Sequence, residues 1–125
     1  MSFAFGRNLR LCSAADFKQV FDQTDIKVSS RYVLMLASVN QLDHPRLGLV
    51  VAKKNIRHAY GRNRAKRHIR ETFRHRQDEL GNLDIVVLVR KGLNELGDSD
   101  INEQLARQWQ KLARRLEERK GSANG

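Results

Sequence analysis

The sequence predicts an α/β (α+β) fold, a single mixed-sheet sandwich with elements in the order helix, two or three strands, helix, strand, helix. Three observations predict it. The chain has 125 residues, which is the size of one domain. Its apolar residues occur both in short β-branched runs and at helical spacing. No repeat and no Pro/Ser-rich linker divides it. We therefore expect one domain over residues 1–125, with helices covering an apolar sheet.

The first helix is predicted over residues 14–22. Ser13, with Asp16 three positions later, forms a variant of the capping box that has Asp in place of the usual Glu or Gln. Phe17 and Phe21 then lie four residues apart on one helix face. Their role stays open, because burial preferences favour core packing, whereas an exposed ring could stack on an unpaired base.

Two strands are predicted next, over residues 31–39 and 46–52, because both segments are rich in strand-forming side chains. The polar connection between them contains the only proline, Pro45. This pattern predicts that the two strands are adjacent and antiparallel. Residues 25–30 are a weaker candidate for a short edge strand. For Tyr32, at the start of the first strand, packing and base stacking are equally open.

The last third of the chain predicts one strand and one long helix. Residues 84–90 form a β-branched run that is typical of a buried central strand. Ser99 is the expected N-cap of the helix, and residues 120–125 are expected to form a frayed tail. Apolar residues recur between them at spacings of three and four, and we assign them, Trp109 included, to the core. These residues are Ile101, Leu105, Trp109, Leu112 and Leu116.

Positive charge is concentrated in one segment. The net charge is +10, and residues 53–76 hold ten Lys or Arg residues but a single acid, Glu71, so the rest of the chain is almost neutral. Like charges this close repel each other unless an anion is shared between them. The segment therefore predicts a polyanionic ligand rather than a merely solvated helix face.

This segment is predicted to be a helix with two different faces. At about 100° per residue, Ala65, Ile69 and Phe73 form one apolar stripe that packs on the sheet. Arginine dominates the other face, and its planar fork pairs with phosphate and stacks on bases. Lys53 and Lys54 add charge just before the helix. The residues expected to face outward together are Asn63, Arg64, Arg67, Arg70 and Arg74.

The sequence favours RNA over DNA as the polyanion. A helix-turn-helix needs a compact helical unit, whereas this basic helix is flanked by strands. Recognition of RNA by shape and phosphate contacts fits that arrangement better.

Other classes of function find no support in the sequence. The single cysteine, Cys12, predicts neither a disulfide nor a zinc site. The three histidines of the basic segment lack carboxylate or thiol companions at ligand spacing, so no metal site is predicted; they are His58, His68 and His75. There is no motif for protein-based hydrolysis. No leader and no membrane span is predicted either, so we expect a cytoplasmic protein.

The basic segment resembles the signature of the bacterial ribonuclease P protein family. The most specific part is Arg62-Asn63-Arg64, followed by Lys66-Arg67 and Arg70-Glu71. The likeness extends over most of the chain and includes residues 16–21, 31–34, 46–51 and 84–90.

This resemblance implies an α-β-β-β-α-β-α sandwich whose basic helix crosses over between parallel strands with a left-handed sense, against the usual right-handed rule. It also implies a subunit of a ribonucleoprotein that removes the 5′ leader from precursor tRNA. The partners would be the catalytic RNA and precursor tRNA, with no membrane and no DNA. Mg²⁺ and the chemistry would belong to the RNA, so that the protein has no catalytic residue, metal or cofactor of its own.

The resemblance further implies two sets of site residues. The basic helix would bind the catalytic RNA, and a cleft between the sheet and the first helix would take the leader. The catalytic-RNA set is Arg62, Asn63, Arg64, Lys66, Arg67, Arg70 and Arg74, and the cleft set is Phe17, Phe21, Tyr32, Lys53 and Lys54. Two alternatives are a structural or ribosomal RNA-binding protein without a role in tRNA cleavage, and an autonomous nuclease.

Overall fold

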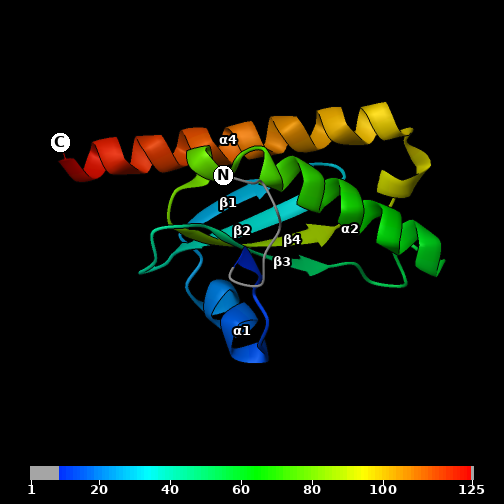
Figure 1. Cartoon of the computed structure of the whole chain (residues 1–125), viewed down its shortest axis with the longest axis horizontal. Coiled ribbons are helices and arrows are strands. Elements are labelled where there is room, and N and C mark those ends of the chain that lie inside the picture. Colours follow the sequence, from blue (N-terminus) through cyan, green and yellow to red (C-terminus); the bar gives the residue numbers. More distant parts are fainter. Residues whose placement is uncertain (1–8, 125) are drawn as a thin grey trace.

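The computed structural model describes residues 9–124, with side chains through Lys120. The first eight residues, part of the segment in which we expect no leader, lie outside the described residues. Figure 1 shows a sheet with α1 on one side and with α2 and α4 on the other. The elements are α1 (Ala14–Asp22), β1 (Ile26–Ser29), β2 (Val33–Val39), β3 (Arg46–Val50), α2 (Ala59–Arg74), α3 (Gln77–Leu80), β4 (Leu83–Val89), η2 (Leu93–Glu95) and α4 (Asp98–Asn124). The predicted mixed α+β class is confirmed.

The strand order is β1-β2-β4-β3, which corrects the prediction that β2 and β3 are adjacent. β2 pairs antiparallel with β1 and β4, and β3 pairs parallel with β4. The physical reason lies in β4, which is almost completely buried and therefore needs a neighbour on both edges. The short polar connection after β2 passes beyond β4, so β3 becomes an edge strand. The expected left-handed sense of the β3-α2-β4 connection stays a prediction.

Each face of the sheet has its own apolar cluster. The larger cluster joins one sheet face to α2 and α4, and Phe73, Leu105 and Trp109 are fully buried in it. The smaller cluster lies under α1 and centres on Leu11, Val20 and Val86. Because α1 has only nine residues, it leaves neighbouring sheet residues half-buried. The face under α1 is therefore the more open of the two.

Local sequence accounts for most element ends. α1 begins after Ser13 with both hydrogen bonds of the capping box, as predicted. α4 begins at Asp98, so Ser99 lies inside its first turn and the prediction of Ser99 as N-cap is wrong. The helix starts directly after Gly97, whose carbonyl accepts the N–H of Ile101. α4 includes residues 120–124, where we expect fraying, and its end extends past the sheet in Figure 1.

α2 and α4 are fastened to each other in the core. The Trp109 indole nitrogen donates a hydrogen bond to Thr72 Oγ1 at 2.8 Å, and its ring lies 5.7 Å from that of Phe73. The core assignment of Trp109 is confirmed. Through these contacts the basic helix is held rigidly against the rest of the molecule.

Candidate nucleic-acid interface

α2 has the two faces that its sequence predicts. Its buried residues are Gly61, Ala65, Ile69 and Phe73, which include the whole predicted stripe. On the opposite face Asn63, Arg67 and Arg70 are exposed. The remaining members of the predicted RNA-facing set are half-buried: Arg62, Arg64, Lys66 and Arg74.

Arg64 departs from the expected outward position. Its guanidinium donates to Asp98 Oδ1 at 2.8 Å and to the carbonyls of Leu96 and Asn94 at 2.9 and 3.3 Å. The side chain is only 25% exposed. Arg64 therefore ties α2 to the loop that leads into α4 and is only partly outward-facing, so its assignment to the RNA-binding set stays a prediction. The helix wheel could not show this, because the partners lie about thirty residues further along the chain.

His68 completes this connection. Its Nε2 lies 3.0 Å from Asp98 Oδ1 and its Nδ1 lies 2.7 Å from Asn102 Oδ1. The hydrogen bond from Arg64, followed by that from His68, lowers the pKa of the Asp98 carboxyl. We call Arg64, His68 and Asp98 the α2–α4 latch.

Two other arginines of α2 also have partners within the protein. Arg62 Nη1 donates to the carbonyls of Ile56 and Arg57 at 3.1 and 2.8 Å, which fastens the preceding loop to the helix. Arg74 pairs with Glu71 at 2.6 Å. Arg67 and Arg70 thus form the exposed centre of the basic face.

A pocket of about 170 Å³ lies where α2 meets the outer edge of the sheet. Arg10, Lys66 and Arg70 supply its charge, and Phe17 lines it from α1. The pocket therefore brings together residues that the sequence analysis placed in two separate sets. Leu11 N–H donates to the Leu47 carbonyl at 3.0 Å, and this bond holds the segment with Arg10 beside β3.

Gly48 explains how Phe17 reaches this pocket. A Cβ atom at Gly48 would lie 2.6 Å from Phe17 Cζ, closer than van der Waals contact permits. The ring therefore lies on the bare backbone of β3. It packs against the smaller apolar cluster and stays half-buried, so core packing is confirmed in part and base stacking stays a prediction.

The other cleft candidates are dispersed. Phe21 is 44% exposed on α1. Tyr32 packs against the larger cluster, which lies on the opposite sheet face from that of Phe17. Lys53 and Lys54 are exposed in the turn after β3. The structure thus brings only Phe17 of this set into the pocket.

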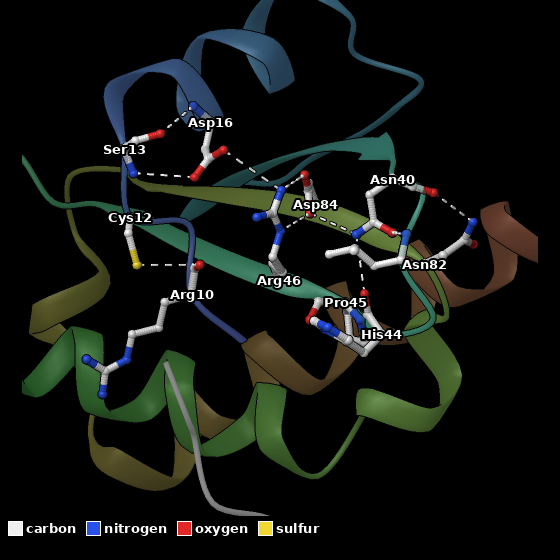
Figure 2. Close-up of polar contacts among 11 residues, drawn as sticks. Arg10, Cys12, Ser13, Asp16, Asn40, His44, Pro45, Arg46, Asn82 and Asp84 are labelled. Atoms are coloured by element: carbon white, nitrogen blue, oxygen red, sulfur yellow. Dashed lines mark hydrogen bonds and ion pairs between the residues drawn. The ribbon is translucent and has the colours of Figure 1, made fainter. Parts of the chain in front are cut away.

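A polar network lies at the start of β3, on the α1 face of the sheet (Figure 2). Arg46 donates to both oxygens of the buried Asp84 carboxylate, at 2.9 and 2.7 Å, and Asn40 donates to Asp84 Oδ1 at 2.8 Å. Arg46 also lies 3.9 Å from Asp16. Partial burial opposes ionisation of Asp16, but its hydrogen bonds with Ser13 and the charge of Arg46 outweigh this and lower its pKa. One guanidinium is shared by two carboxylates, so this end offers no excess positive charge.

Sequence reasoning missed Arg10, Asp98 and Tyr60. Leu9-Arg10-Leu11 alternates apolar and polar side chains, a strand-like signal that could have placed Arg10 on an exposed edge. Asp98 carries no such signal, because its role depends on long-range contacts. Tyr60 is 76% exposed at the start of α2, inside the basic segment.

Within residues 9–124, no group of three or more His, Cys, Asp or Glu side chains is placed to hold a metal ion. The same part of the chain contains no helix with the length and apolar character needed to cross a membrane. A mixed α+β sandwich with a basic crossover helix and a basic pocket at the adjoining sheet edge defines a nucleic-acid-binding protein.

Comparison with known proteins narrows this class. Residues 5–113 match the family described as Ribonuclease P. The chain is 52% identical to the ribonuclease P protein component of Azotobacter vinelandii, over 88% of this chain and 85% of that protein. It is 51% identical to that of Pseudomonas aeruginosa, over 88% and 82%.

Solved structures of ribonuclease P proteins share the fold. The Staphylococcus aureus protein has a TM-score of 0.76 at 29% identity, with 82% of this chain and 93% of that chain covered. The Thermotoga maritima protein has a TM-score of 0.67 at 33% identity, with 78% and 96% covered.

The chain belongs to the bacterial ribonuclease P protein family. It is therefore a subunit of ribonuclease P, an endoribonuclease that processes the 5′ end of tRNA, and its partner is the ribonuclease P RNA. This confirms the expected function and disfavours a ribosomal or purely structural RNA-binding role.

Proposed function

We propose that the exposed face of α2 binds the ribonuclease P RNA, and that the pocket between α2, β3 and α1 takes the single-stranded 5′ leader of precursor tRNA. Arg67 and Arg70 contact phosphates of the RNA, with Asn63 beside them, while Arg62, Arg64 and Arg74 position the helix. Lys66 and Arg70 face the leader together with Arg10 and Phe17.

One observation carries the proposal for α2. Gly61, Ala65, Ile69 and Phe73 anchor one face in the core, and Arg67 and Arg70 are exposed on the other. A rigid helix presents guanidinium groups at fixed positions, so little conformational entropy is lost when they bind phosphate. Such contacts release counterions from RNA, which is the main source of affinity for a polyanion.

The distribution of charge on the α1 face supports the position of the leader. At the start of β3 Arg46 is shared by Asp84 and Asp16, so a phosphate gains nothing there. Further along β3 the pocket combines three cationic side chains with the Phe17 ring. A single strand is bound by this combination of backbone charge and base stacking.

The chemistry of cleavage belongs to the RNA in this proposal, together with the Mg²⁺ that it holds. The protein contributes binding and orientation. Its cations offset the repulsion between two RNAs where the substrate meets the catalytic RNA.

The test of the α2 interface is a change in salt dependence. The variant Arg67→Ala/Arg70→Ala should bind ribonuclease P RNA roughly tenfold or more weakly, and the slope of log K against log salt should become shallower by about one to two. The matched control is Lys111→Ala/Arg114→Ala, which removes the same charge from exposed positions on α4. Equal slopes for the two variants would remove α2 from the interface.

The leader site needs a comparison of two substrates. Phe17→Ala should weaken holoenzyme binding of leader-bearing precursor tRNA by about 5- to 150-fold, the loss expected for one base stack, and leave mature tRNA unaffected. Phe21→Ala, on the same helix but outside the pocket, is the control. Equal losses for both tRNAs, with an unchanged thermal midpoint, would argue against the leader site.

A further inference from the structure

The most exposed of the large hydrophobic side chains in the described part of the chain is Tyr60, with 76% of its surface accessible. It lies in the first turn of α2 and stacks on His58, with ring centroids 5.8 Å apart and planes 18° apart. His58 is exposed as well. Core packing does not require this ring, so its position calls for another explanation.

Tyr60 belongs to the same helix face as the proposed RNA contacts. At about 100° per residue, Arg67 lies within about 20° of Tyr60 around the helix and Asn63 lies within about 60°. Two turns separate Tyr60 from Arg67, a rise of about 10 Å. The aromatic ring therefore continues the basic face toward the start of the helix, where Lys53, Lys54 and Arg57 are also exposed.

The backbone that carries the Tyr60 ring is held in place by close packing and by hydrogen bonds. Gly61 packs so closely on the preceding loop that an added Cβ would lie 2.8 Å from Ile56 Cγ2. Arg62 binds the carbonyls of Ile56 and Arg57, and Asn55 Nδ2 donates to the Val89 carbonyl of β4 at 2.8 Å. Loop and helix start are thus fixed before any ligand arrives, which lowers the entropic cost of binding.

We propose that Tyr60, backed by His58, is a stacking platform for an unpaired base of RNA at the start of the basic helix. The inference rests on the proposed RNA-binding face of α2 and adds a second kind of contact to it. Stacking on an aromatic ring tolerates any base, because every base has a π face. The expected source of the base is the ribonuclease P RNA, since the platform lies in line with Arg67; the leader is the other source.

The experiment measures binding of ribonuclease P RNA by three variants of the full chain across a range of salt concentrations. Tyr60→Ala should weaken binding about 5- to 150-fold at every salt concentration, from the loss of one stack. The slope against log salt should stay unchanged, because no phosphate contact is lost. Tyr60→Phe should stay within about twofold of the parent, because the ring is retained.

Fluorescence supplies a readout specific for stacking. The parent chain has a single tryptophan, Trp109, which is buried and provides the baseline. In Tyr60→Trp the added emission should be quenched by the ribonuclease P RNA. A single-stranded leader oligonucleotide is the second arm, and quenching by it alone would assign the base to the leader and overturn the expected source.

Arg67→Ala, measured in parallel, separates this inference from the proposed function. If Arg67→Ala lowers the salt slope while Tyr60→Ala binds like the parent, only the platform is overturned. If neither variant changes binding, the interface on α2 itself fails. Equal losses in Tyr60→Phe and Tyr60→Ala would also overturn stacking, because they would assign the effect to the hydroxyl group.

Discussion

Arg64 and Arg67 lie three positions apart on α2 but have different surroundings. Arg64 donates to Asp98 and to two loop carbonyls, whereas Arg67 is exposed. Both belong to the signature of the family, so membership in the signature does not assign one common role. In the proposed interface, Arg64 is a positioning residue that acts through the start of α4, and Arg67 is the residue that contacts phosphate.

The α2–α4 latch should respond to acid. The pKa of Asp98 is lowered in the folded protein, chiefly by the hydrogen bond from Arg64, so the folded state binds this proton less readily than the unfolded state. Its contribution to stability is therefore present above the unfolded pKa, about 3.8, and is lost as the pH falls through the lower folded value. Asp98→Asn should lower the urea midpoint at pH 6 more than at pH 3.

The control for the latch is Asp100→Asn, in the same first turn of α4. Both carboxylates interact favourably with the N-terminal end of the helix dipole, but Arg64 donates to Asp98. A similar pH-dependent loss in both variants would assign the effect to the helix dipole and not to the latch.

Substitutions at Phe17 and Gly48 should have non-additive effects on the free energy of unfolding. Gly48→Ala forces the new Cβ into the Phe17 ring, and overpacking of this kind costs about 1–3 kcal/mol. In a Phe17→Ala background the closest obstacle is gone and only Leu11 Cδ1, at 3.1 Å, remains, so the same change should cost less. Urea unfolding of the four proteins gives the coupling energy, and additive losses would contradict the contact.

At the scale of elements, one ion pair joins three strands. Arg46 opens β3, Asp84 lies in the central β4, and Asn40, directly after β2, donates to the same carboxylate. Asp84 is buried, and its carboxylate accepts hydrogen bonds from both of these partners. The pair therefore fixes the end of the sheet under α1.

Removal of Arg46, the main partner of Asp84, should lower the free energy of unfolding. Arg46→Met leaves the Asp84 carboxylate without its main partner, and breaking a buried pair in this way costs about 3–5 kcal/mol. Arg46→Lys keeps the charge but loses the two-pronged geometry, so an intermediate loss is expected. Arg46→Met/Asp84→Leu should recover most of the stability. A loss below about 1 kcal/mol in Arg46→Met would place the pair among weak surface pairs.

The elements also show what the sequence predicts and what it does not. Local signals were sufficient for α1, whose cap is Ser13, and for the buried stripe of α2. They failed for the neighbour of β3, because strand order depends on the burial of β4, more than thirty residues further along. They failed for Arg64 for the same reason, since Asp98 follows it by 34 residues. Hydrophobic periodicity shows which face of a helix or strand is buried, but it does not show which other element packs or pairs with it.

At the scale of the whole molecule, the excess positive charge is concentrated in one segment. The net charge of +10 arises almost entirely in residues 53–76, while the sheet and α4 hold acids and bases in near balance. Arg62, Arg64 and Arg74 of this segment have partners within the protein, whereas Arg67 and Arg70 are exposed. The result is a neutral scaffold that carries one cationic surface.

This distribution of charge predicts how the protein changes the Mg²⁺ requirement of ribonuclease P. In the proposed interface, the cations of α2 and Mg²⁺ would both reduce repulsion between the catalytic RNA and precursor tRNA, so each would partly replace the other. Stimulation of precursor tRNA cleavage by the protein should be greatest at low Mg²⁺ and should shrink as Mg²⁺ rises. Arg67→Gln/Arg70→Gln should raise the Mg²⁺ concentration for half-maximal cleavage, whereas Lys111→Gln/Arg114→Gln should not. Equal stimulation at every Mg²⁺ concentration would mean that the protein acts by shape alone, and the charge on α2 would then need a different explanation.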